Sequence, residues 1–180
     1  MQTPFPRPAI VVICGPTGVG KTRAAIAAAE RFNGEIIGAD SVQVYRRLDI
    51  GTAKPTRAER DAMPHHLVDF LEPDAAFDAR RFTQMAGALI RKLSAAGKVP
   101  FVVGGTGLYI KALLHGLFDP PVACRVLRRR LQQEAAERGG PTLHGRLAAC
   151  DPEAAGRIHP NDSVRIVRAL EIYEATGRPI

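Results

Sequence analysis

Apolar residues in the first part of the chain gather in short continuous runs that turn residues separate. The runs cover residues 9–14, 35–39, 67–71 and 99–103. Runs of this length are typical of strands that are buried on both faces of a parallel sheet. Between them, the alanine-rich stretch 22–32 and the stretch 77–96, where apolar residues recur every three or four positions, predict helices. Strands that alternate with helices predict an α/β fold.

Polar segments connect these elements. Residues 56–63 and 108–115 predict two further helices. Residues 40–55 allow two readings, a polar binding loop or a plain connection with a short helix at 41–46, and the pattern alone does not separate them.

After residue 116 the apolar runs give way to helical stretches. These cover residues 123–138, 142–149, a short helix opened by Asp151 and Pro152, and residues 163–176. The first of them is studded with arginine. We therefore expect two domains, a sheet-containing core over residues 1–116 and a helical domain over residues 117–180.

A glycine-rich segment lies between the first predicted strand and the first predicted helix, and it fits the pattern G-x-x-x-x-G-K-[ST]. In this context its glycines allow a tight turn that points several backbone N–H groups at one anion. Lys21 would reach terminal phosphate oxygens, and Thr22 would ligate Mg²⁺. The predicted phosphate-binding residues are Gly15, Pro16, Thr17, Gly18, Val19, Gly20, Lys21 and Thr22.

Two more polar features follow strands of the predicted sheet. Asp40 comes directly after the run 35–39, at the edge where open α/β sheets bind ligands. It could act as a general base or as an outer partner of Mg²⁺. Asp69 is a second possible acid, but it lies inside its apolar run. The turn Gly104–Gly107 follows the fourth run and brings backbone N–H groups and the Thr106 hydroxyl to the same edge.

Composition narrows the class of protein. Of 180 residues, 46% are apolar and 24% are charged, as in ordinary soluble proteins. No stretch approaches the length of a membrane span, and the short N-terminal segment leaves no room for a signal peptide. The three cysteines Cys14, Cys124 and Cys150 show no metal-ligand spacing, which favours free thiols in a reducing cytosol. We expect Cys14 in the core. His65 and His66 are adjacent and point to opposite sides, so a shared metal is not expected, and we favour a structural role for at least one of them.

The net charge of +7 suits an acidic partner such as nucleic acid. The excess of arginine and alanine is equally typical of a high-GC genome, so charge alone does not choose between these readings. From these features alone we predict phosphoryl or pyrophosphate chemistry with an unknown acceptor.

Several blocks in order give the chain a specific resemblance to the tRNA dimethylallyltransferases. The blocks are Gly15–Thr22, Ala39–Arg46, Leu48–Pro55, Pro64–Asp69, Val102–Tyr109, Ile158–Asp162 and Arg168–Glu171, and the match runs over residues 9–180. The resemblance implies an α/β fold with a P-loop NTPase-like parallel-sheet core and a helical insertion that binds tRNA. Family members continue past the position of Ile180, so the insertion and the C-terminal part are expected to be incomplete here.

The resemblance also implies a reaction. The phosphate-binding loop would hold dimethylallyl diphosphate, and N6 of a flipped-out adenosine next to the tRNA anticodon would attack it. Lys21, Thr22 and Mg²⁺ would neutralise the leaving diphosphate, Asp40 would be the base, and Thr106 would contact substrate. The residues that the resemblance places on tRNA are Asp40, Ser41, Val42, Gln43, Thr106, Arg128, Val164, Arg165, Ile166, Val167 and Arg168.

Other functions stay open at this point. They are prenylation of a free nucleotide by an adenylate isopentenyltransferase, phosphoryl transfer by a small-molecule kinase, and ligand binding without turnover. The expected setting is a cytoplasmic monomer with no membrane partner.

Overall fold

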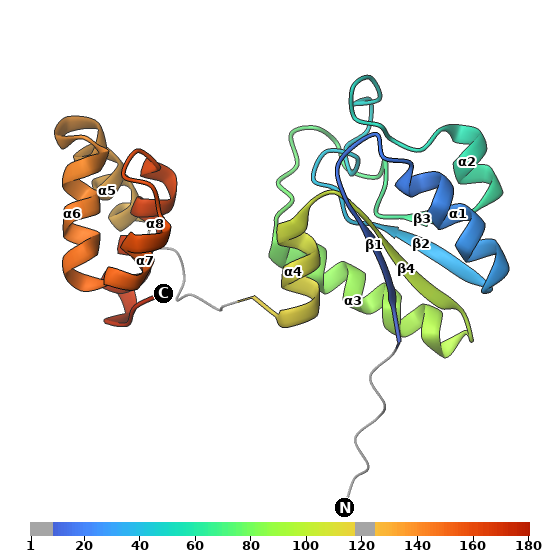
Figure 1. The fold of residues 1–180 in the computed structure, drawn as a ribbon. Helices are drawn as coiled ribbons and strands as arrows, with labels where there is room; N and C mark the ends of the chain where they lie inside the picture. Colours follow the sequence, from blue (N-terminus) through green and yellow to red (C-terminus); the bar gives the residue numbers. More distant parts are fainter. Residues whose placement is uncertain (1–8, 118–124) are drawn as a thin grey trace, which may run out of the picture. The chain divides into compact units, whose positions relative to one another are not determined.

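The computed structural model describes residues 9–117 and 125–180, and its fold is drawn in Figure 1. The chain divides into two compact units, one up to Leu117 and one from Phe118. The first unit contains the sheet, and the described part of the second is helical.

The sheet has four parallel strands in the order β1 (Val11–Cys14), β4 (Val99–Gly104), β2 (Gly34–Gly38) and β3 (His65–His66). Val103 of β4 lies in register with Ile13 of β1 and with Gly38 of β2. These three strands therefore end at nearly the same level, and the segments that follow them leave the sheet at one edge (Figure 1). The predicted α/β fold with a parallel sheet is confirmed.

Helices cover both faces of this sheet. Helix α1 (Lys21–Arg31) packs Ala25 and Ala29 in one cluster with Ile36 and Phe101. On the opposite face, α3 (Ala79–Ala95) and α4 (Gly107–His115) bury their apolar sides in a second cluster with the neighbouring strand residues Ile37 and Val102. Burial on both faces explains why the strands read as continuous apolar runs.

The strand expected at 67–71 is wrong. Pairing in β3 stops at His66, and Leu67 and Asp69 then adopt positive φ angles of 58° and 57°. Only an isolated bridge between Leu71 and Tyr45 follows. The run is apolar because Leu67, Val68 and Leu71 are buried, so the pattern reports burial here and not extended backbone.

The polar segments that connect these elements agree better with the sequence pattern than the run 67–71 does. Residues 41–46 form turns, which removes the short-helix reading. Helix α2 (Arg57–Ala62) starts with a capping box in which Thr56 and Glu59 satisfy each other's backbone N–H groups.

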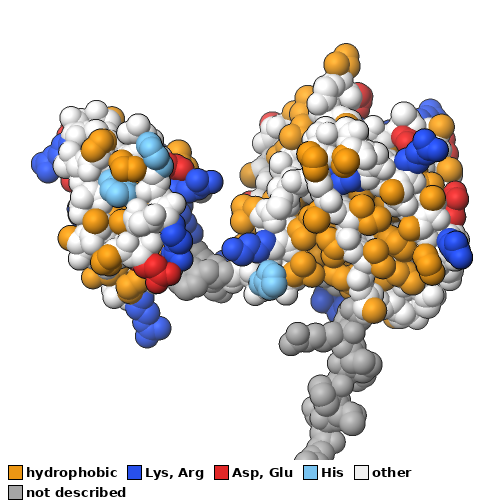
Figure 2. All heavy atoms as spheres, in the orientation of Figure 1, with side chains coloured by type: hydrophobic (Ala, Val, Ile, Leu, Met, Phe, Trp, Pro, Cys, Tyr) orange, Lys and Arg blue, Asp and Glu red, His pale blue; other side chains and the backbone are white. Residues whose placement is uncertain are grey.

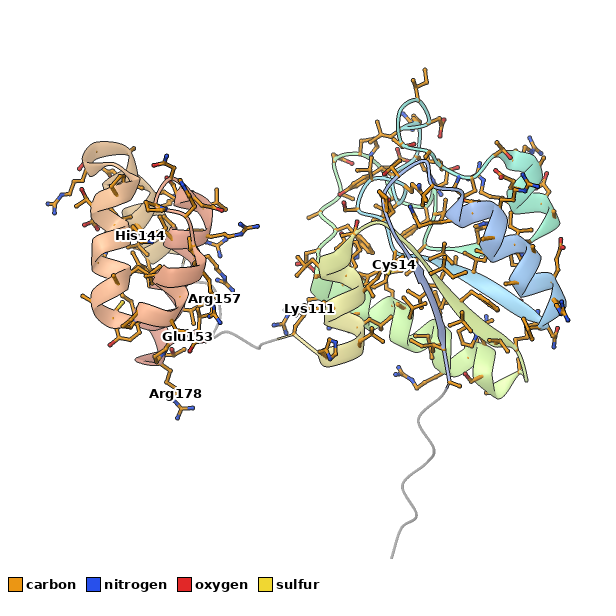
Figure 3. All side chains as sticks on the ribbon, viewed as in Figure 1. Cys14, Lys111, His144, Glu153, Arg157 and Arg178 are labelled. Carbon is orange, nitrogen blue, oxygen red and sulfur yellow. The ribbon has the colours of Figure 1, made fainter. Side chains whose placement is uncertain are left out.

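Cys14 is exposed, which corrects its expected place in the core. In the described sheet β1 is one of the two edge strands and pairs with β4 alone, so Cys14 has a neighbouring strand on one side only. Figure 3 labels Cys14 at the end of β1, and Figure 2 shows hydrophobic side chains gathered on the same face of the unit. Val11 of β1 is also 38% exposed. Cys150 is half-buried, and Cys124 lies outside the described residues.

The helical unit contains α5 (Arg125–Arg138), α6 (Gly140–Cys150), α7 (Pro152–Arg157) and α8 (Ser163–Thr176). It has its own core, formed by Leu131, Leu143, Leu147, Ile166 and Leu170. Asp151 and Asp162 accept hydrogen bonds from backbone N–H groups at the starts of α7 and α8. Across both described ranges, no helix combines the length and apolar character that crossing a membrane requires.

Candidate active site

The glycine-rich loop forms the first half of the site. Gly15, Gly18 and Gly20 have φ angles of 155°, 84° and 88°, a region that favours glycine. The loop ends where α1 begins, so the helix directs its first free N–H groups and its positive dipole end at the loop. A cavity of about 260 Å³, here called the phosphate chamber, is lined by Gly18, Gly20, Lys21 and Thr22.

Lys21 curls over this loop. Its Nζ donates a hydrogen bond of 2.7 Å to the carbonyl oxygen of Pro16. This bond holds the ammonium charge at the chamber that Lys21 lines. The other two N–H bonds of the ammonium stay available for a ligand. Val19 is 62% exposed, and its side chain lines neither this chamber nor the second one described below.

A second cavity of about 310 Å³ lies beside the first and is here called the Thr106 chamber. Its lining includes Gly15 and Pro16 from the loop, Ser41 and Val42 after β2, and Thr106 after β4.

Two residues, Thr17 and Asp40, line both chambers. The site is therefore a pair of compartments with one carboxylate between them.

The carboxylate of Asp40 has a divided role. Its Oδ1 accepts hydrogen bonds from the backbone N–H groups of Val42 at 2.9 Å and Gln43 at 3.2 Å. A methyl group placed on Gly105 would lie 3.7 Å from Oδ2, so Oδ2 faces the glycine turn after β4. One oxygen shapes the loop, and the other is left for a ligand.

Thr106 ties the two strand ends together. Its backbone N–H donates to the carbonyl oxygen of Ala39 at 3.1 Å, and its Oγ1 accepts from the backbone N–H of Ser41 at 2.9 Å. Gly104 lets the strands approach this closely, because a Cβ there would sit 2.0 Å from the Ala39 oxygen. The predicted residues Asp40, Ser41 and Thr106 are thus brought together.

Gln43 holds a second loop against the site. Its Nε2 donates to the carbonyl oxygens of Thr52 and Ala53, both at 2.9 Å. Thr52 lines the Thr106 chamber, and Gln43 itself lines the phosphate chamber.

Lys54 was not predicted and fixes the same loop. Its side chain is only 3% exposed, and its Nζ donates to Tyr45 O at 2.8 Å, Asp49 Oδ1 at 2.6 Å and Asp69 Oδ1 at 2.9 Å. Burial alone would lower the pKa of Lys54, but the hydrogen bonds to both carboxylates outweigh it and raise the pKa. Asp69, the second candidate acid, also binds Arg60 at 2.6 Å and is occupied by this network. No local sequence signal marks Lys54.

Lys54→Met is expected to destabilise the core unit by about 2 to 3 kcal/mol, because it leaves Asp69 and a backbone carbonyl without their buried cation. Hydrogen exchange of the core-unit amides measures this change, because the chain has two units and need not unfold in a single transition. The matched control is Arg57→Gln, which removes an exposed i,i+4 partner of Asp61 and is expected to change stability by less than about 0.5 kcal/mol. An equal effect of both changes would contradict the assignment.

The two histidines have separate partners. His65 Nδ1 lies 2.7 Å from the carbonyl oxygen of Met63, and His66 Nε2 lies 2.6 Å from Glu35. Within the described ranges, no group of three or more His, Cys, Asp or Glu side chains is arranged to hold a metal ion. His66 is therefore accounted for by its partner Glu35, whereas the buried Nε2 of His65 has no hydrogen-bond partner.

The phosphate chamber nevertheless suits Mg²⁺. Its lining residues include Thr22, Asp40 and Glu59, and Oε2 of Glu59 already accepts hydrogen bonds from Thr56. Mg²⁺ prefers oxygen ligands and is commonly held by one or two protein groups, with waters and substrate phosphates completing its shell. The donor set fits such an ion.

The remaining predicted residues lie in the helical unit. A groove of about 500 Å³ between α5 and α8 is lined by Arg128, Gln132, Val164, Val167 and Arg168, among others. We call it the α5–α8 groove. The other two residues of the predicted tRNA-binding segment stand apart. Arg165 forms an exposed pair with Asp162, and Ile166 is fully buried in the core, which removes its side chain from any surface contact.

Comparison with known proteins adds the family. The family model described as IPP transferase matches residues 43–180, and the model described as isopentenyl transferase matches residues 8–74. The chain belongs to the IPP transferase family. Among its curated relatives, the tRNA dimethylallyltransferase of Desulfosudis oleivorans is 58% identical over 173 residues, 96% of this chain and 55% of that protein. The tRNA dimethylallyltransferase of Anaeromyxobacter sp. strain Fw109-5 is 58% identical over 170 residues, covering 94% and 57%.

Solved structures agree. The full-length tRNA isopentenylpyrophosphate transferase of Bacillus halodurans has 45% identity and a TM-score of 0.62, over 96% of this chain and 57% of that one. A eukaryotic dimethylallyltransferase acting on tRNA has 36% identity and a TM-score of 0.79, over 94% and 42%. The chain therefore shares their P-loop NTPase-like fold, and it spans about half the length of the curated relatives it matches.

Proposed function

We propose that the chain carries the catalytic core of a tRNA dimethylallyltransferase. The reaction moves the dimethylallyl group from dimethylallyl diphosphate to N6 of an adenosine next to the anticodon, with release of diphosphate. One observation carries the proposal, namely that Asp40 lies between a chamber built for phosphates and a second chamber. The family membership and the names of the relatives support it.

The phosphate chamber supplies what the donor needs. Diphosphate leaves an allylic carbon readily only when its charge is neutralised, and the loop N–H groups, the dipole of α1 and Lys21 all direct positive charge there. Mg²⁺, when bound at Thr22, adds a Lewis acid toward the same oxygens.

The Thr106 chamber is assigned to the acceptor. An exocyclic adenine amine is barely basic, so its attack benefits from a carboxylate that accepts its proton. The C–O bond to diphosphate breaks, the bond from N6 to carbon forms, and the N6 proton passes to Asp40 Oδ2. Thr106 and Ser41 line the compartment that the extruded base would enter.

RNA contacts are assigned to both units. Residues 40–42 line the Thr106 chamber, Gln43 lines the phosphate chamber, and Arg128 and Arg168 line the α5–α8 groove. Arginine side chains make many of the phosphate contacts in protein–nucleic acid complexes. We place the reaction in the cytoplasm and assign it to a monomer.

The decisive experiment incubates the chain with labelled dimethylallyl diphosphate, Mg²⁺ and an anticodon stem-loop RNA. Label is expected on the RNA and not on AMP offered in competition. Label on AMP would instead indicate an adenylate isopentenyltransferase, and phosphoryl transfer from ATP without use of the prenyl donor would indicate a kinase. Binding of both ligands without product, seen also in a version extended to the length of the relatives, would refute the proposed reaction.

A further inference from the structure

A buried acid lies beside the α5–α8 groove. Glu171 of α8 is 2% exposed, and its Oε2 accepts hydrogen bonds from Arg128 Nε at 3.1 Å and Nη2 at 2.8 Å. The same oxygen accepts from Arg168 Nη1 at 2.6 Å. Two guanidinium groups from two helices thus meet on one carboxylate oxygen.

The acid stays charged in this position. Burial alone would raise the pKa of Glu171, but the hydrogen bonds from Arg128 and Arg168 outweigh it and lower the pKa. The triad therefore carries one net positive charge. Without the carboxylate, the two guanidinium groups would repel each other at the distance that it now bridges.

The arrangement leaves donors free. Arg128 donates to Glu171 through Nε and Nη2, and Arg168 donates through Nη1. Each guanidinium therefore keeps further N–H groups for a ligand. The side chains of Arg128 and Arg168 are 42% and 36% exposed, and both line the groove. The free N–H groups are thus accessible at one place on the surface.

We propose that Glu171 is a positioning residue for RNA, whose carboxylate fixes Arg128 and Arg168 side by side so that together they bind a phosphate at the α5–α8 groove. This inference rests on the proposed function, since it takes the partner to be tRNA. A fixed pair of guanidinium groups binds an anion without first losing side-chain freedom, which is the gain that Glu171 provides.

Glu171→Gln separates two explanations of RNA binding, action of the arginines through charge alone and positioning of the arginines by Glu171. The two predict opposite changes in RNA affinity. The change keeps the size of the side chain but removes one negative charge. If the arginines act only through their charge, stem-loop RNA should bind more tightly and with a steeper salt dependence. If Glu171 positions them, binding should weaken about tenfold, and the slope of log affinity against log salt should fall by about 1.

Glu174→Gln is the matched control. Glu174 lies on the same helix and pairs with Arg130 and Arg146, neither of which is among the lining residues of the groove. This variant loses the same charge, and its RNA affinity is expected to stay unchanged or to rise. A double-mutant cycle adds a second check, because Glu171→Gln should have no further effect when Arg128 and Arg168 are both Gln.

Folding of each variant is checked by circular dichroism of the full chain. If Glu171→Gln does not fold, Arg128→Lys decides, because it keeps the charge but cannot hold a carboxylate and a phosphate as a planar fork does. Unchanged affinity of that variant, or equal or tighter binding by folded Glu171→Gln, overturns the inference alone. Absence of stem-loop binding by the unmutated chain overturns it together with the RNA part of the proposed function.

Discussion

Asp40→Asn is expected to lower the rate of prenyl transfer by about 10²- to 10⁴-fold, the usual contribution of a positioned general base. The affinity for inorganic diphosphate should stay near that of the unmutated chain, because the loop N–H groups and Lys21 bind it without Asp40. Single-turnover transfer to the stem-loop and calorimetric titration with diphosphate measure the two quantities.

A second variant separates chemistry from loop structure. An asparagine keeps an Oδ1 that can accept from the N–H groups of Val42 and Gln43, whereas Asp40→Ala removes it. Both variants should lose transfer, and the alanine variant should additionally lose order in residues 41–43. If diphosphate affinity falls as far as the transfer rate in the asparagine variant, Asp40 serves the metal or the loop and is not the base.

Gly104→Ala is expected to destabilise the core unit by about 3 kcal/mol or more. The new methyl group would sit 2.0 Å from the oxygen and 2.3 Å from the carbonyl carbon of Ala39, and backbone cannot move aside as a flexible side chain can. Because the chain has two units, unfolding need not be a single transition, so hydrogen exchange of the β2 and β4 amides is the suitable measurement.

Gly107→Ala is the control for that change. Gly107 is the first residue of α4, and a Cβ there would meet nothing within 4 Å. Alanine is the better helix former, so this variant should be neutral or slightly stabilised, by at most about 1 kcal/mol. Equal protection from exchange in both variants would contradict the close packing of Gly104 on Ala39.

Local signals predicted most of the sheet-containing unit. The glycines at 15, 18 and 20, followed by a lysine and an alanine-rich stretch, define strand, loop and helix within a short window. The position of Asp40 followed equally directly, because it comes just after a strand. These features depend on neighbours in sequence, which is why the pattern was sufficient.

The features that the sequence predicted wrongly or missed depend on residues far along the chain. The run 67–71 is buried as expected, but Asp69 is held by Lys54 and Arg60, which helps to explain why it does not extend β3. Cys14 is exposed because of strand order, and no periodicity reports which strand is at the edge. Glu171 meets Arg128 from 43 positions away, so no local pattern indicated that the two side chains are paired.

The division of the chain into two units has a consequence for how tightly RNA is held. If the proposed function holds, the sheet-containing unit binds one part of the RNA and the helical unit binds another, so the interaction is bivalent. Once one unit has bound, the other meets its part of the RNA at a raised effective concentration, so two modest affinities multiply. Loss of the α5–α8 groove contact should therefore reduce occupancy of the Thr106 chamber as well, although no atom of that chamber has changed.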